Sequence, residues 1–144
     1  MVKAVVMCLA FSCAIIGCAS HLSHAPLAQD TGKGRIIVLC SQDRMDSNAQ
    51  MPLMCNNRVV ASLTAGSYCE IELLDGQYSL STGSGDPAQT TVPLKVDVAL
   101  SAGSVRYFEI VPQGFESPGA MTLKEISGVA ATSHLSKLKK VKSQ

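Results

Sequence analysis

The segment CEIELLDGQYSL, residues 69–80, is the clearest structural signal in the sequence. Its apolar residues at 69, 71 and 73 alternate with Glu70 and Glu72, so an extended chain has one apolar face and one acidic face. Asp75-Gly76 is a typical turn pair, and apolar residues resume after it. The segment predicts two antiparallel strands, each with one face against a core and the other toward water.

Similar patterns lie on both sides of this segment. Residues 36–40 (IIVLC) are continuously apolar, which is typical of a strand buried on both faces. Residues 53–55 and 59–63 flank Asn56-Asn57, a pair that tolerates positive φ and suits a hairpin. Three further strands are expected at residues 92–100, 105–111 and 121–126. About seven or eight short strands predict an all-β, antiparallel two-sheet sandwich over residues 35–128, with a short C-terminal helix after it.

Residues 129–144 carry a different pattern. Leu135, Leu138 and Val141 recur at helical spacing, while lysines occupy the other faces. This predicts a short basic helix, which could lie on an anionic membrane or meet a partner. The alternative interpretation, and the preferred one, is a solvated C-terminal tail.

Charge argues against a nucleic-acid partner. Residues 18–136 contain seven basic and eleven acidic residues, whereas the last eight positions contain four lysines. The sequence has three Tyr, three Phe and no Trp. A nucleic-acid-binding domain would combine a basic face with interleaved aromatic residues, and this acidic body has neither.

The N-terminus has the features of a secretory signal. Lys3 precedes an apolar run at residues 4–16, which is shorter than the roughly 20 residues that span a bilayer. The run ends in Ile15-Ile16-Gly17-Cys18, which resembles the lipobox of bacterial lipoproteins. That resemblance implies that residues 1–17 are a signal peptide, that the chain is cut before Cys18, and that the Cys18 thiol receives a diacylglyceryl group.

Residues 18–34 are small, polar or turn-prone and have no apolar period, so we expect a flexible tether. Ala19 and Ser20 follow the cysteine, where many lipoproteins retained in the inner membrane have an aspartate. The resemblance therefore implies a lipid anchor in the outer membrane, with the domain facing the periplasm.

Three cysteines, Cys40, Cys55 and Cys69, remain in the expected mature domain, which would lie in an oxidising compartment. Three cysteines allow one disulfide and one leftover thiol. The preferred pair is Cys40 with Cys55, because both would lie on early strands that could be neighbours. The other pairings, and three buried thiols, remain open alternatives.

Four segments resemble a family of small bacterial lipoproteins known as the domain of unknown function DUF2846. They are RIIVLC (35–40), NNRVVASLTAGSY (56–68), IELLDGQYSL (71–80) and VALSAGSVRYFEI (98–110). The family is similar to transthyretin-like or carboxypeptidase-regulatory-like sandwiches, so the resemblance implies a β-sandwich. It implies no activity, and the three cysteines are not part of the family pattern.

Two functions are compatible with these observations. The first is a non-enzymatic binding or scaffolding module that is held at the membrane by its lipid and meets an envelope protein, with no cofactor, metal or catalytic residue. Glu70 and Glu72 share a face, but without a nearby signal for a nucleophile or metal we interpret them as a solvated strand face. The alternative is a periplasmic enzyme with the leftover cysteine as nucleophile and His134, the only histidine outside the tether, as its base.

Overall fold

The computed structural model of the chain describes residues 32–43, 49–83, 95–113 and 120–144. The expected signal peptide at 1–17, the expected lipidation site Cys18 and all but the last three residues of the expected tether lie outside the described residues. The same holds for the part of the expected strand at 92–100 that precedes Lys95.

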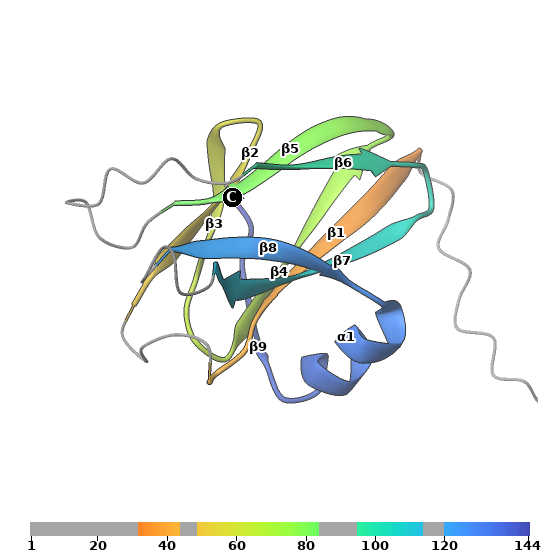
Figure 1. Cartoon of the computed structure of the whole chain (residues 1–144). Helices are drawn as coiled ribbons and strands as arrows, with labels where there is room; N and C mark the ends of the chain where they lie inside the picture. Colours follow the sequence, from red (N-terminus) through yellow and green to blue (C-terminus); the bar gives the residue numbers. More distant parts are fainter. Residues whose placement is uncertain (1–31, 44–48, 84–94, 114–119) are drawn as a thin grey trace, which may run out of the picture.

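The described residues form two β-sheets packed face to face, with one short helix outside them (Figure 1). The sheet orders are β8-β7-β1-β4-β9 and β3-β2-β5-β6. The predicted two-sheet sandwich with a short C-terminal helix is therefore confirmed. The elements are β1 (Lys33–Cys40), β2 (Met51–Cys55), β3 (Arg58–Leu63), β4 (Ser67–Leu74), β5 (Gly76–Thr82), β6 (Lys95–Leu100), β7 (Val105–Pro112), β8 (Met121–Ile126), α1 (Gly128–Leu135) and β9 (Lys139–Val141).

Strand pairing is mostly antiparallel, but β1 with β7 and β4 with β9 are parallel. The predicted hairpin joins β2 to β3, and Asn56 and Asn57 adopt φ values of 50° and 64°. The turn at Asp75-Gly76 does not close a hairpin, because it carries the chain from β4 in one sheet to β5 in the other. Gly76 has a φ of 156°, which favours glycine at this corner.

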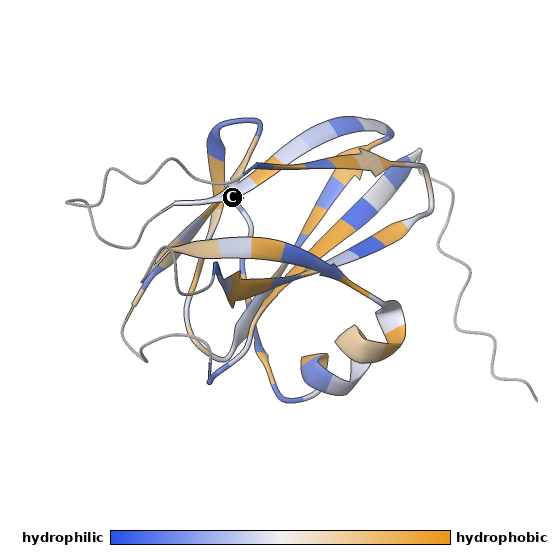
Figure 2. Ribbon diagram, in the orientation of Figure 1, coloured by the Kyte–Doolittle hydropathy of each residue, from blue (hydrophilic) through white to orange (hydrophobic). Residues whose placement is uncertain are grey.

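The main core lies between the two sheets. Phe108, Ile36, Leu53 and Leu80 are among its fully buried side chains. Along most strands, apolar residues that face this core alternate with polar residues (Figure 2). A side chain on the wrong face would therefore leave the core, which is why the alternation in the sequence identified the strands.

A second, smaller cluster lies on the outer face of the five-stranded sheet. Ile37 and Leu39 of β1 and Ala131 of α1 are buried there, and Tyr107 and Leu135 pack around them. The helix thus covers the outer side of β1, and the prediction that residues 36–40 are buried on both faces is confirmed. Ser127 caps the helix, because its hydroxyl accepts a hydrogen bond from the Ala130 N–H at 3.3 Å.

Strand β1 begins at Lys33, so the expectation that residues 33 and 34 belong to the tether is wrong. Gly34 is buried, and a Cβ atom there would lie 2.6 Å from Leu100 Cγ and 2.6 Å from the Ser101 carbonyl oxygen. The residue is a glycine because β1 passes too close to the end of β6 for any side chain. Gly34 therefore belongs to the packing of the two sheets.

Gly34→Ala is expected to lower the free energy of unfolding by about 1–3 kcal/mol, because a methyl group would force β1 away from the Ser101 backbone. Denaturant unfolding of the variant measures the effect. Lys33→Ala, at the exposed neighbouring position, is the control and should change stability by less than about 0.5 kcal/mol. Equal stabilities for the two variants would contradict the close approach.

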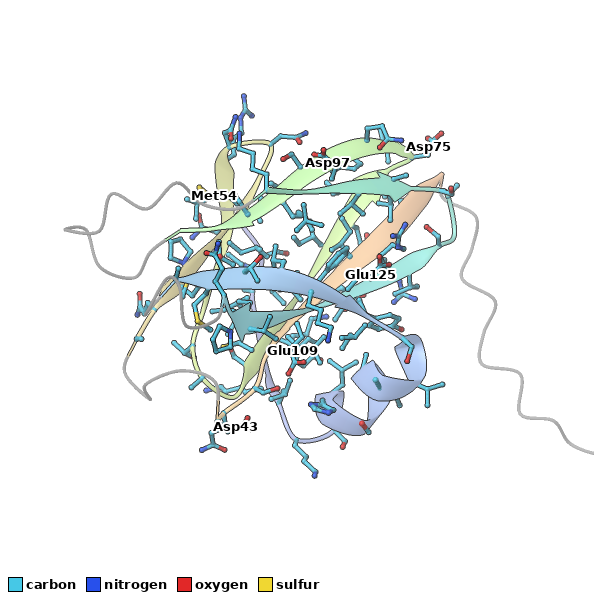
Figure 3. All side chains as sticks on the ribbon, viewed as in Figure 1. Asp43, Met54, Asp75, Asp97, Glu109 and Glu125 are labelled. Carbon is cyan, nitrogen blue, oxygen red and sulfur yellow. The ribbon has the colours of Figure 1, made fainter. Side chains whose placement is uncertain are left out.

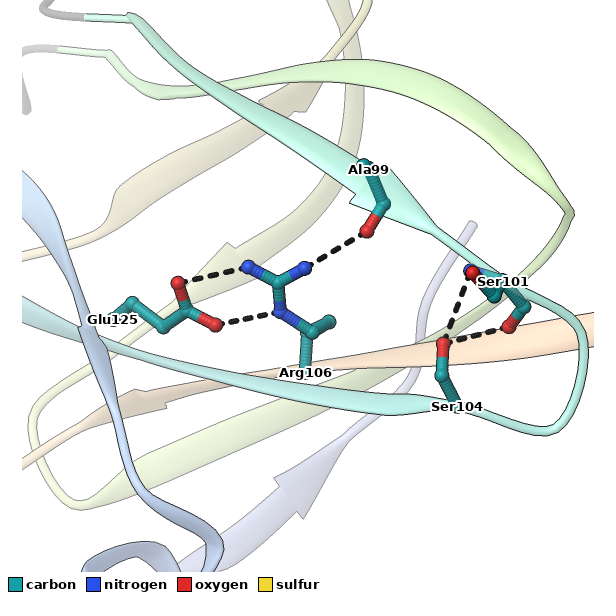
Figure 4. A network of polar contacts seen from close by, with 5 residues as sticks. All are labelled: Ala99, Ser101, Ser104, Arg106 and Glu125. Carbon is teal, nitrogen blue, oxygen red and sulfur yellow. Dashed lines mark hydrogen bonds and ion pairs between the residues drawn. The ribbon is translucent and has the colours of Figure 1, made fainter.

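The side of the sandwich between β6 and β7 is held by side chains. Arg106 of β7 donates from Nε and Nη2 to the Glu125 carboxylate of β8, at 2.5 and 2.8 Å. Its Nη1 donates to the Ala99 carbonyl oxygen of β6 at 2.9 Å, so one guanidinium links the two sheets (Figure 4). Ser104 and Ser101 bond each other across the connection between β6 and β7.

The C-terminal segment contains the expected short helix, but the helix is shorter than the spacing of Leu135, Leu138 and Val141 predicts. The helix ends at Leu135, and Lys139–Val141 form strand β9 instead of continuing it. The helical spacing was misleading because its members pack in two places: Leu135 and Leu138 join the cluster under α1, whereas Val141 packs against the main core. Pairing of β9 with β4 also rules out a wholly solvated tail.

Candidate functional site

The last six residues, 139–144, connect the two sheets on the side opposite Arg106, and we call them the C-terminal strap. β9 pairs in parallel with the first three residues of β4, and the Lys139 N–H donates to the Gly66 carbonyl oxygen at 3.0 Å. The Gln144 N–H then donates to the Val60 carbonyl oxygen of β3 at 2.8 Å. In Figure 1 the chain end accordingly lies by the four-stranded sheet, although β9 belongs to the other one.

An ion-pair network attaches the strap to the outer face of β4. Lys140 Nζ lies 2.6 Å from Glu70 Oε2, and Arg35 Nη1 of β1 lies 3.0 Å from Glu70 Oε1. The hydrogen bond from Lys140, together with that from Arg35, holds the pKa of Glu70 below its usual value despite partial burial. Glu70 therefore stays ionised and acts as a structural link, which does not suit a general acid or base.

The backbone of Glu72 points to an edge of β4 that no strand of the described residues covers. Arg35 is the cross-strand partner of Glu72, but its N–H donates to the Ser104 carbonyl oxygen on the other side of β1, at 2.8 Å. Arg35 and Glu72 are thus a non-hydrogen-bonded pair, and the Glu72 N–H and C=O point away from β1. β9 ends opposite Cys69, so it does not reach Glu72.

An open groove lies beside this uncovered part of β4. β4 and the strap form its walls, and Lys33 at the start of β1 and Val60 of β3 complete it. Four aliphatic side chains that belong to or pack against the main core line it: Val60, Ile71, Leu73 and Val141. Its polar lining has charges of both signs, from Lys33, Glu70, Glu72, Lys140 and Lys142. A lining that combines aliphatic and charged side chains is compatible with a protein-binding surface.

A second groove lies between the end of β1 and the end of α1. Ser41, Asp43, His134 and Lys137 are among the residues that line it. The Ser41 hydroxyl donates directly to Glu109 Oε1 at 2.7 Å, and Figure 3 labels Asp43 and Glu109 in this region. Because this hydroxyl already bonds a carboxylate, the groove does not contain the serine–histidine contact that activates a nucleophile.

The expectation that Cys40 and Cys55 lie on neighbouring strands is wrong. β1 and β2 belong to different sheets, and no disulfide joins Cys40, Cys55 or Cys69. Met51, the first residue of β2, pairs with Leu63 of β3. Ser67, the cross-strand partner of Cys40, follows Leu63 by four residues. Cys55 lies four residues further along β2, about 13 Å from Met51, at the other end of the strand.

All three thiols are buried in the main core. Burial raises the pKa of Cys69 to about 11, and burial together with Glu109 raises that of Cys40 to about 11. Burial also raises the pKa of Cys55. His134 lies on the other side of the five-stranded sheet, in the groove with Ser41, so the expected base does not meet a thiol.

Within residues 32–43, 49–83, 95–113 and 120–144, no group of three or more His, Cys, Asp and Glu residues could hold a metal ion. The same residues include no helix with the length and hydrophobicity needed to cross a membrane. The sequence reasoning missed the strap and the free edge at Glu72. Lys139–Val141 is too short for a period-two pattern, and nothing local indicates which strand it joins.

Comparison with known proteins gave no match to a family model, a curated protein or a solved structure. The groove beside β4 is therefore the candidate site on its geometry alone.

Proposed function

We propose that the chain is a membrane-anchored envelope lipoprotein that acts as a non-enzymatic binding or scaffolding module. The observation that carries the proposal is the apolar run ending in Ile15-Ile16-Gly17-Cys18. Lipid on Cys18 would anchor the chain in the outer membrane, and the sandwich would face the periplasm. The groove beside β4 is the surface we assign to an envelope protein partner.

The distance between anchor and domain suits this role. Fourteen residues lie between Cys18 and Lys33, where β1 begins. A flexible segment of that length has a root-mean-square reach of about 20 Å. The sandwich would clear the lipid head groups and still sample only partners close to the membrane. Anchoring would thus raise the effective concentration of the domain near such a partner.

Cys18→Ala is expected to move the protein from the membrane fraction to the soluble periplasmic fraction, because two or three acyl chains are the whole of the proposed anchor. Fractionation of cells that express the variant, with palmitate labelling, measures the change. Cys13→Ala is the matched control, since it removes a cysteine of the same apolar segment outside the lipobox pattern. A Cys18→Ala protein that stays in the membrane fraction would refute the anchoring.

The geometry does not support the alternative, an enzyme with a cysteine nucleophile. A nucleophilic thiol needs a lowered pKa, access to substrate and a nearby base. Cys40, Cys55 and Cys69 are buried and have raised pKa values, and His134 is on the far side of the sheet. The groove, by contrast, combines exposed backbone groups with apolar side chains, as a binding surface does.

A further inference from the structure

We propose that the groove beside β4 binds an extended segment of a partner protein, which adds to the five-stranded sheet as a strand along Glu70–Leu74. This inference rests on the proposed binding function and names the chemistry of the partner. The occupant is a peptide in β conformation with alternating basic and aliphatic side chains.

The backbone provides the first support. The Glu72 N–H and C=O point to the open edge, beyond the last residue that β9 covers. The C=O of Leu74 accepts a hydrogen bond from the Tyr78 hydroxyl at 2.9 Å, so this carbonyl is already satisfied at the end of the strand. The edge open to a peptide therefore centres on Glu72. Main-chain hydrogen bonds to such an edge are the source of affinity in strand addition.

The strap shows which side chains this edge accepts. Its Lys140 meets Glu70 on the outer face of the sheet, while Val141 packs against the main core. Glu72 lies two residues beyond Glu70 on the same face and is exposed, and Leu73 and Val60 lie among the aliphatic residues of the groove. A strand that continues the same pattern would place a lysine or arginine against Glu72 and an aliphatic side chain against Leu73 and Val60.

A second copy of the chain is a poor occupant. Two β4 edges related by a twofold axis centred on Glu72 would place Glu72 opposite Glu72 of the copy. Centring on Ile71 would place Glu70 opposite Glu72. Like charges directly opposite one another in a sheet are destabilising, so charge favours a basic segment of another protein.

Binding of synthetic peptides to the purified full chain tests the inference. The probe has four Lys-Val repeats, and the matched peptide has four Glu-Val repeats. We expect the lysine peptide to bind more tightly and to shift the backbone amide signals of Glu70, Glu72 and Leu74 most strongly. Glu72→Lys should weaken its binding about fivefold, the value of one favourable cross-strand charge pair, and should reverse the preference between the two peptides.

Asp97→Lys is the control variant, because Asp97 is an exposed acid on the edge strand β6 of the other sheet. It should leave both affinities unchanged. Equal binding of the two peptides, no binding, or signal shifts confined to β6 or β8 would overturn the inference. The measurement needs no lipid anchor. A peptide that does not bind would therefore contradict the groove inference alone, whereas the Cys18→Ala fractionation tests the anchoring.

Discussion

A chain that ends at Leu138, and so lacks the C-terminal strap, is expected to be less stable by about 2–4 kcal/mol. The truncation removes the pairing of β9 with β4 and the bond from Gln144 to Val60, which are backbone hydrogen bonds with net values of about 1 kcal/mol each. It also removes Val141 and uncovers apolar side chains of the main core beneath it. Denaturant unfolding monitored by circular dichroism measures the loss.

The Lys140→Gln variant distinguishes the contribution of the ion pair to stability from the contribution of the strap's packing. The pair with Glu70 is largely exposed on the lysine side, and Arg35 remains to bond Glu70, so this variant should lose less than about 1 kcal/mol. A truncated chain as stable as the full chain would show that the strap does not stabilise the fold. A Lys140→Gln variant as unstable as the truncation would assign the effect to charge.

The folded protein is expected to lose stability steeply between about pH 9 and pH 11. The pKa values of Cys40 and Cys69 are raised from 9.0 to about 11 in the fold, so above pH 9 the unfolded chain releases protons that the folded chain keeps. The stabilisation from the neutral thiols is complete below pH 9 and is lost as pH rises through 11. Each thiol contributes about 2 kcal/mol to the change by pH 11.

Unfolding at a series of pH values measures this loss, with Cys40→Ala and Cys69→Ala as comparison variants. Each variant starts less stable because it leaves a cavity, but it should lose less between pH 9 and pH 11 than the parent. Parallel stability curves for parent and variants would contradict the raised pKa values. Alkylation by iodoacetamide should be slow at pH 8 in the folded protein and fast in urea, since the thiolate is the reacting form.

Much of the fold was predictable because the signals are local. Alternation at residues 69–73 marked β4, and the continuous run at 36–40 marked a strand buried on both faces. Asn56-Asn57 marked the hairpin correctly. The Asp75-Gly76 turn was also recognised, yet its sequence does not distinguish a hairpin from a corner between sheets. That choice depends on which neighbour β4 already has, and β1 fills the place beside it.

The candidate site was much less predictable. Glu70 and Glu72 look equivalent in the sequence, since both are acidic residues on the outer face of one strand. In the structure Glu70 forms ion pairs with Arg35 and Lys140, whereas the backbone of Glu72 borders an open edge. The difference comes from where β9 ends, and β9 lies 70 residues beyond Glu70 in the chain.

By itself the sequence determined the strands from β1 to β8, the face of each that meets the core, and that two sheets result, because side-chain alternation is a property of neighbouring residues. Only the tertiary structure decided the strand order, the absence of a disulfide between Cys40 and Cys55, the need for glycine at 34 and the free edge at Glu72. These features depend on backbone pairing between distant segments. The hydrogen-bonding groups that make such pairs are the same in every residue except proline, so the sequence does not encode the partner locally.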